Sequence, residues 1–136
     1  QDTYRLEGDA PAGMLGRAML IQPLMPAIVE GELSLFFAGG VLAHAIVKRP
    51  AEGDFRVQPQ FGGVNVAIVP PAPALALAAA ALAATGGDIL YARVDMVGDN
   101  ANGWALMEIE LIEPYLYLDR AADGGTAFAQ AVRARL

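Results

Sequence analysis

The sequence predicts an α+β fold, with a mainly antiparallel sheet and flanking helices. Residues 90–97 (LYARVDMV) and 104–111 (WALMEIEL) alternate apolar and polar side chains, as strands with one buried face do. A Gly39–Gly40 pair separates two further strand-like segments, which is typical of a hairpin turn. An alanine-rich stretch preceded by prolines favours a helix. Strands dominate and helices are inserted among them, as in α+β proteins.

The first part of the chain predicts little regular structure. Residues 10–17 are predicted as a short helix, with Asp9 as its N-cap and Pro11 in its first turn. Residues 18–24 form an apolar run that ends among prolines, which favours a connector over a central strand.

The next part predicts a β-hairpin around Gly39–Gly40. Residues 28–38 are its first strand, residues 41–48 the returning strand, and residues 49–53 the loop that follows. Alternation places two sets of side chains on opposite faces of the first strand, with Glu30, Glu32 and Ser34 on one face and Leu33 and Leu35 on the other.

The second half adds a short strand, two helices and the hairpin of residues 90–111. Residues 64–69 are strand-like, and the alanine-rich helix is predicted over residues 73–85, ended by Gly86–Gly87. The final helix is predicted over residues 126–135. Its inward-facing residues are predicted to be Phe128, Ala129 and Val132.

The composition of the chain excludes several classes of function. With 136 residues and 55% hydrophobic residues, the chain can bury one core. A net charge of -6 argues against a nucleic-acid surface, and the absence of cysteine excludes disulfides and thiolate metal sites. Residues 71–84 are too short to span a bilayer, and no signal segment opens the chain. Because QDTYRLEGD begins as though inside a domain, we expect a C-terminal part of something longer.

The hairpin of residues 90–111 carries the strongest functional pattern. One of its faces is predicted to hold Arg93, Asp95, Glu108 and Glu110, with Asp95 opposite Glu108 and Arg93 opposite Glu110. Carboxylates gathered in this way repel one another unless a cation lies among them, which favours a Mg²⁺ or Mn²⁺ site. The alternative is an ordinary exposed strand face with an Arg93–Glu110 ion pair. The other face is predicted to be apolar, formed by Leu90, Ala92, Val94, Met96, Ala105, Met107, Ile109 and Leu111.

Two other segments are candidates for binding. In QPLMP, residues 22–26, the prolines leave backbone groups of Leu24 and Met25 without a regular ladder, so that they could bind a flat heterocycle. The alternative is a kinked crossover.

A basic segment follows the first hairpin. It holds Lys48, Arg49 and Arg56, and Gly62–Gly63 permits close approach to an anion. The alternative is a solvated basic loop. His44 lies within a strand and has no obvious partner, which is more typical of packing or of the surface than of catalysis. No Ser–His–Asp set can be assembled, and no Walker or Rossmann motif is present.

Two blocks resemble the C-terminal half of an ATP-grasp ligase. They are LIQPLMPAIVEGELSLFFAGGVLAHAIVKRPAEGDFRVQPQFGG and YARVDMV…MEIELIEP, which together cover most of residues 20–114. The resemblance is to the glutathione-synthetase-like branch, including proteins similar to the ureidoserine cyclo-ligase of cycloserine biosynthesis. It implies that residues 1–21 end a flap-bearing subdomain, residues 22–26 form an adenine hinge, and residues 27–136 form the metal- and ATP-binding lobe. The N-terminal substrate domain would be absent.

The resemblance also implies roles for single residues. The hinge residues would bind adenine, Glu32 the ribose hydroxyls, and Lys48 a phosphate. Arg56, with Gly62–Gly63, would contact the acyl substrate and the transferred phosphate, and Arg93 would face the acyl phosphate. The hinge residues are Gln22, Pro23, Leu24 and Met25, and the metal ligands are Asp95, Glu108 and Glu110, where the family commonly has Asn at the last position.

The implied function is that of a carboxylate–amine ligase, or one with another nitrogen nucleophile, acting through an acyl phosphate. Its cofactors would be ATP and Mg²⁺ or Mn²⁺, and its partners a small carboxylate and an amine-type acceptor, with no nucleic acid and no membrane. We expect a cytoplasmic protein, with a homo-oligomer left open, and an isolated fragment that is inactive. The alternatives are a non-catalytic nucleotide- or protein-binding module derived from such a lobe and a structural α+β domain.

Overall fold

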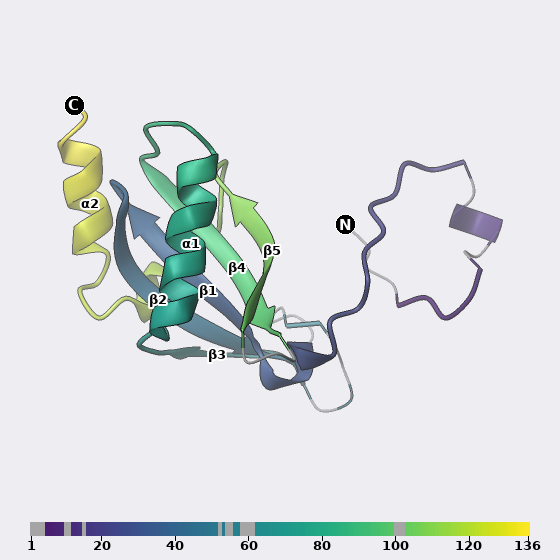
Figure 1. Cartoon of the computed structure of the whole chain (residues 1–136). Coiled ribbons are helices and arrows are strands. Elements are labelled where there is room, and N and C mark those ends of the chain that lie inside the picture. Colours follow the sequence, from purple (N-terminus) through teal and green to yellow (C-terminus); the bar gives the residue numbers. More distant parts are fainter. Residues whose placement is uncertain are drawn as a thin grey trace.

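Five antiparallel strands form one sheet in the order β3-β2-β1-β4-β5. The computed structural model describes residues 5–9, 12–14, 16–51, 53, 56–57, 62–99 and 103–136. Helix α1 (Ala72–Ala84) lies across one face of the sheet, and helix α2 (Thr126–Arg133) lies at the end formed by the β1–β2 hairpin (Figure 1). The predicted α+β class is confirmed. The strands are β1 (Glu32–Ala38), β2 (Val41–Arg49), β3 (Val64–Ala67), β4 (Tyr91–Gly98) and β5 (Trp104–Glu110).

The main core lies between α1 and the sheet. Leu33, Leu35 and Phe37 alternate along β1 toward the helix, as predicted for the two leucines. The buried residues of α1 are Ala74, Ala78 and Ala81, whose small side chains let the helix axis approach the strands closely. Each fully buried leucine contributes roughly 2 kcal/mol of hydrophobic stabilisation.

Two glycine features set the ends of elements. Gly39 and Gly40 join β1 to β2 with φ angles of 58° and 79°, a left-handed pair that suits a tight hairpin. Gly86 follows α1 with a φ of 70°, as predicted for its C-terminal stop.

Helix α2 is held at its N-terminus by a carboxylate. The Asp123 side chain accepts hydrogen bonds from the backbone N–H groups of Ala127 (2.8 Å) and Gly125 (2.9 Å), which lower its pKa. Phe128 packs against Tyr91, with ring centroids 5.9 Å apart. Ala129, predicted to face inward, is exposed instead.

Several predicted elements differ from the structure. Residues 26–30 form the 3-10 turn η2 (Pro26–Glu30), because Ile28 N–H donates to the Met25 carbonyl and Gly31 N–H to the Ile28 carbonyl. Strand β1 therefore begins at Glu32, and Glu30 does not share a sheet face with Glu32. The predicted helix over residues 10–17 is a 3-10 turn, η1 (Ala12–Met14), and Pro11 lies outside the described residues.

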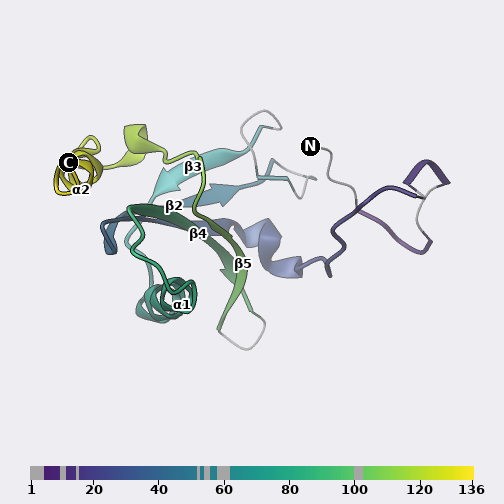
Figure 2. The same ribbon diagram turned by 90° about the horizontal axis from the view of Figure 1, so that it is seen from above.

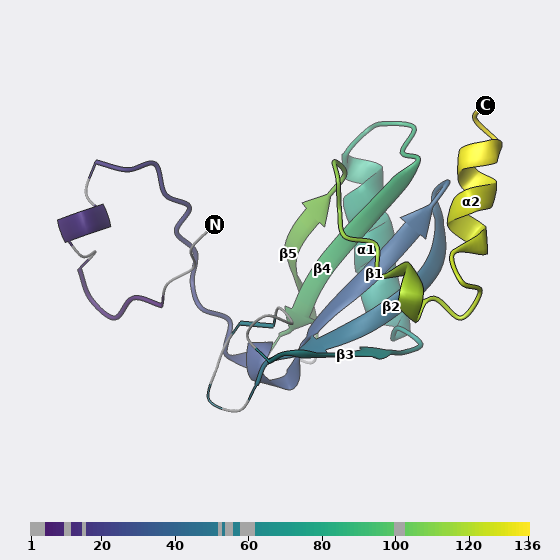
Figure 3. The ribbon, with the colours of Figure 1, turned by 180° about the vertical axis from the view of Figure 1, so that it is seen from behind.

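The segment before η2 leads away from the sheet (Figures 1 and 3). Residues 18–25 are irregular, which confirms the predicted connector. Leu20 and Ile21 are 89% and 78% exposed. No helix among the described residues has the length and apolar character needed to cross a membrane.

Candidate functional site

The sheet face opposite α1 carries a group of polar side chains from four strands. Figure 2 shows α1 on one side of the sheet only, and Figure 3 looks onto the opposite face. The strand register pairs Glu32 with Lys48, Ser34 with Asp95, Asp95 with Glu108, and Arg93 with Glu110. The two pairings predicted within the β4–β5 hairpin are confirmed. We call this group the charged face: Glu32, Ser34, Lys48, Arg93, Asp95, Glu108 and Glu110.

Asp95 lies at the centre of the charged face and is 2% exposed. Its Oδ1 atom accepts a 2.5 Å hydrogen bond from the Ser34 hydroxyl and lies 3.5 Å from Lys48 Nζ. Its Oδ2 atom accepts a 2.9 Å hydrogen bond from Arg93 Nε. Both oxygens of the carboxylate are therefore held by donors from the same face.

Lys48 and Glu32 form a second ion pair beside Asp95. Lys48 is 6% exposed and belongs to β2, so it is not part of a solvated basic loop. Burial raises the pKa of Glu32, and the Lys48 charge offsets only part of that effect. Such a pair is costly to bury and stays charged only while both partners are present.

Arg93 joins the three carboxylates that were predicted as metal ligands. Its guanidinium contacts Asp95, lies 2.6 Å from Glu110 Oε2 through Nη1 and 3.7 Å from Glu108 Oε2 through Nη2. Burial acts against the charged guanidinium, but Asp95, Glu110 and Glu108 outweigh it and raise the pKa of Arg93. The Arg93–Glu110 ion pair of the second alternative is therefore present, and the three carboxylates are arranged around Arg93.

Apolar groups close both ends of the charged face. At one end, Ile28, Val57 and Val97 are buried together, with Met25 packed against them. At the other end, His44 stacks on Phe36 with ring centroids 4.3 Å apart, and Tyr117 packs on the same Phe36 ring. In Figure 3 the segment after β5 crosses this face toward η4 (Leu118–Arg120). These two groups flank the ion pairs, of which the Lys48 and Asp95 side chains are buried and the Glu108 side chain stays exposed.

His44 packs against Phe36, which is one of the two settings expected for it. Its Nε2 atom lies 2.9 Å from the Leu116 carbonyl oxygen, which fixes the ring, and its Nδ1 atom is buried without a hydrogen-bond partner. Burial lowers the pKa of His44, although the Leu116 carbonyl acts in the opposite direction.

The predicted apolar face of the β4–β5 hairpin is wrong in part, because the structure has a β-bulge there. The register shifts between Asp95 and Met96, so that Met96 pairs with Leu106 rather than Met107. Ala105 and Met107 consequently pack with Ile28, Val57 and Val97, on the side of the charged face. Trp104 takes their place against the main core, and Leu111 lies outside the strand and is 37% exposed.

Most of the predicted hinge lies apart from the charged face. Gln22, Pro23 and Leu24 are exposed on the segment that leads away from the sheet. Met25 alone packs beside Val57 and Val97. Its carbonyl accepts the Ile28 N–H bond, so one of the backbone groups predicted to lack a regular partner is already paired.

The predicted anion loop is only partly described. Arg56 is half-buried next to the buried Val57. A Cβ atom at Gly63 would come within 2.3 Å of the Val57 carbonyl oxygen, so this glycine is required by close approach of the chain to itself. Gly62 has a φ of 82° and is exposed.

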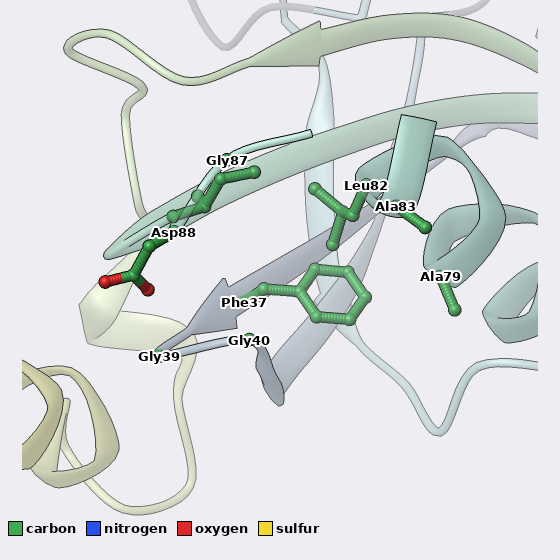
Figure 4. A pocket seen from close by; sticks show the side chains of 9 residues that line it. Phe37, Gly39, Gly40, Ala79, Leu82, Ala83, Gly87 and Asp88 are labelled. Carbon is green, nitrogen blue, oxygen red and sulfur yellow. The ribbon is translucent and has the colours of Figure 1, made fainter. Parts of the chain in front are cut away.

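The structure has a cavity of about 320 Å³ on the opposite face of the sheet. It lies between the end of α1 and the Gly39–Gly40 turn (Figure 4), and none of the predicted site residues lines it. Leu82, Ala83 and Phe37 form the apolar part of its wall, and the Asp88 carboxylate, which pairs with Arg135, points away from Phe37.

The charged face offers oxygen donors of the kind that Mg²⁺ and Mn²⁺ prefer. Glu110 Oε2 is buried and accepts no hydrogen bond of good geometry, although Arg93 Nη1 is close, so a coordinating atom remains unsatisfied. In the described part of the chain, no three His, Cys, Asp or Glu side chains are grouped tightly enough to hold a metal. The carboxylate oxygens are therefore of the kind that binds a divalent cation. In the present arrangement, the spacing between the carboxylates accommodates the Arg93 guanidinium.

Comparisons with known proteins agree with this architecture. The chain is 35% identical over 135 residues to the cycloserine biosynthesis protein DcsG of Streptomyces lavendulae, a match covering 89% of this chain and 43% of that protein. The crystal structure of D-cycloserine synthetase DcsG has a TM-score of 0.72 at 34% identity, covering 84% of this chain and 41% of that chain. No protein-family model matches the chain.

Two more distant structures define the fold. The ATP-grasp ligase PsnB, complexed with a precursor variant, Mg and ADP, has a TM-score of 0.56 at 12% identity, covering 76% of this chain and 32% of that chain. The D-alanine–D-alanine ligase of Bacillus anthracis, complexed with ATP, has a TM-score of 0.51 at 20% identity, covering 77% of this chain and 39% of that chain. The fold of the chain matches part of the fold of these ligases. The resemblance predicted from the sequence, to the C-terminal half of an ATP-grasp ligase similar to the cycloserine enzyme, is confirmed.

The chain spans less than half the length of these two relatives. Sequence reasoning found six of the seven members of the charged face as site residues. It placed Ser34 on the correct face but gave Ser34 no role. The signal that could have found it is its position two residues after Glu32 on the same strand, which puts both side chains on one face.

Proposed function

We propose that this chain is the nucleotide- and metal-binding lobe of an ATP-dependent ligase that joins a carboxylate to an amine or another nitrogen nucleophile. The observation that carries the proposal is the charged face, in which two cations and four carboxylates are gathered on one face of an ATP-grasp sheet. The complexes of distant ATP-grasp relatives with ATP, or with Mg and ADP, support the choice of ligand.

The roles of the residues follow from the resemblance and from the face on which they lie. Residues 22–25 would bind adenine through backbone groups, and Glu32 would hold the ribose hydroxyls. Lys48 would neutralise phosphate charge, while Arg56 and the Gly62–Gly63 loop would contact the acyl substrate. In this proposal, residues 1–21 belong to the flap-bearing subdomain and residues 27–136 form the metal- and ATP-binding lobe.

Asp95, Glu108 and Glu110 would hold the divalent cation, which when bound neutralises phosphate charge and polarises the phosphoryl oxygens. Their three carboxylates share one cation, Arg93, in the present arrangement. Binding of the divalent cation would release Arg93 from some of these contacts, so that Arg93 could face the transferred phosphoryl group.

The proposed chemistry needs positioning and charge stabilisation more than covalent work by the protein. The substrate carboxylate attacks the γ-phosphorus of ATP, the bond to the β–γ bridging oxygen breaks, and ADP leaves. The nitrogen nucleophile then attacks the acyl carbon, loses a proton, and releases phosphate. Lys48 and Arg93 would stabilise the charge that develops on the phosphoryl oxygens, in a site flanked by the apolar groups at both ends.

One observation favours a second candidate, a non-catalytic binding module derived from an ATP-grasp lobe. Each buried carboxylate of the charged face already has a cationic partner from the same chain. A face neutralised in this way can be a structural ion network, retained without catalysis.

Removal of the predicted metal ligands distinguishes the two. In the full-length protein that carries this chain, we expect Asp95→Asn and Glu108→Gln to lower Mg²⁺- and ATP-dependent phosphate release by about 100-fold while the fold is retained. Glu113→Gln, which removes an exposed carboxylate just after β5, is the matched control. Unchanged phosphate release in both site variants would contradict the metal assignment, and a full-length protein that releases no phosphate would favour the binding module. The 136-residue chain alone is expected to release little or no phosphate, because the other half of the nucleotide clamp is needed.

A further inference from the structure

Ser34 has no role in the proposed reaction, although it is fully buried at the centre of the charged face. Its neighbours along β1 are Leu33, Leu35 and Phe36, all nearly inaccessible to water. A hydroxyl in such surroundings costs about 1–3 kcal/mol unless it is hydrogen-bonded. Its presence therefore needs a partner.

The partner is Asp95. Ser34 and Asp95 are directly opposite in the β1–β4 register, and the hydroxyl donates to Asp95 Oδ1 at 2.5 Å. This is the length of a charge-assisted O–H···O⁻ bond, which is stronger than a bond between neutral groups. Ser34 thus directs its hydroxyl proton to a single oxygen of the predicted metal ligand.

The three donors around Asp95 differ in kind. Lys48 and Arg93 bring positive charge to the carboxylate, at 3.5 Å from Oδ1 and 2.9 Å from Oδ2. Ser34 is neutral. It restricts rotation of the carboxylate without cancelling the negative charge that a cation would need.

We propose that Ser34 is a positioning residue that orients the Asp95 carboxylate for a divalent cation. This inference rests on the metal assignment in the proposed function. A partner of a metal ligand commonly contributes 10- to 100-fold in metal affinity by fixing the orientation of that ligand. Ser34 holds Oδ1 from a central strand, while Oδ2 depends on Arg93, which also serves Glu108 and Glu110.

The test measures Mn²⁺ binding to the full-length protein that carries this chain, by the paramagnetic broadening of amide NMR signals along β4 and β5. We expect Ser34→Ala to weaken Mn²⁺ binding about 10-fold. Ser34→Thr keeps the hydroxyl and is expected to bind Mn²⁺ more tightly than Ser34→Ala. Thr85→Ala is the matched control, because it removes a hydroxyl that donates to the Leu82 carbonyl at the exposed end of α1. Its Mn²⁺ affinity should equal that of the unchanged protein.

The outcomes separate the inference from the proposed function. Equal Mn²⁺ affinity in Ser34→Ala and the unchanged protein would overturn the positioning role alone. Equal weakening in Ser34→Ala and Ser34→Thr would overturn it too, since packing would then explain the loss. If the unchanged protein shows no saturable broadening along β4 and β5, the metal assignment fails and the inference fails with it. Ser34→Cys, similar in size and a weak donor, replaces Ser34→Ala if that variant does not fold.

Discussion

The two faces of the sheet are buried by different means. On the α1 face, side chains from β1 and β4 are apolar and pack against small alanines of the helix. On the charged face, ion pairs lie between an apolar group around Val57 and an aromatic group around Phe36. The first arrangement stabilises the fold through area removed from water. The second holds charges in place at an energetic cost, which is typical of a site rather than of a core.

The largest effect is expected on the α1 face. Leu35 is fully buried, and Leu35→Ala removes apolar contacts and leaves a cavity that α1 can fill only in part. We expect the free energy of unfolding to fall by about 3 kcal/mol, measured by urea denaturation of the chain.

Leu106→Ala is the control for that change, because Leu106 lies on the edge strand β5 and is 43% exposed. Its loss should be below about 1 kcal/mol. Equal losses at both positions would show that the α1 face is not the stabilising core.

A smaller loss of stability is expected on the charged face. Arg93→Met removes the cation shared by three carboxylates, of which Asp95 is buried and Glu108 is largely exposed. We expect a loss of about 2 kcal/mol, below the usual cost of an unpaired buried charge because two of the partners reach water. The loss should shrink in high salt, since ions screen the remaining repulsion.

Arg93→Lys keeps the charge but not the planar fork, so its unfolding free energy should lie between those of the unchanged chain and Arg93→Met. Equal stability of Arg93→Met and the unchanged chain would mean that the ion network contributes nothing net to the fold.

The α1 face was largely predictable because it follows local rules. Alternation placed Leu33 and Leu35 together, and Gly39–Gly40 fixed the hairpin turn between β1 and β2. Residues 28–30 were misassigned because IVE continues the alternation of β1. The 3-10 turn there depends on Pro26 and on the left-handed Gly31, which local alternation does not reveal.

The charged face was predictable in its pairing but not in its burial. Strand alternation and a short loop were enough to place Arg93 opposite Glu110 and Asp95 opposite Glu108. Lys48 is buried beside Glu32 and Asp95, which are distant in sequence, so the sequence alone could equally place a basic segment at 48–56 in a loop. The bulge after Asp95 moves Met107 to the charged side, and no residue type in WALMEIEL specifies that position.

The smallest effect is expected at the aromatic end of the charged face, where it appears as a pH dependence. Burial lowers the pKa of His44, so the folded chain binds this proton less readily than the unfolded chain does. The free energy of unfolding should therefore be highest above the ordinary histidine value of 6.5 and fall as pH drops below it.

His44→Phe keeps a ring to stack on Phe36 but cannot titrate, so the fall in unfolding free energy between pH 7.5 and about pH 5 should be smaller in this variant. Loss of the bond to the Leu116 carbonyl lowers the stability of the variant by a similar amount at every pH in that range, which separates packing from titration. Urea denaturation of both proteins across this pH range measures the difference. Parallel pH curves for the two would mean that protonation of His44 does not couple to folding, and that the carboxylates of the charged face set the acid sensitivity.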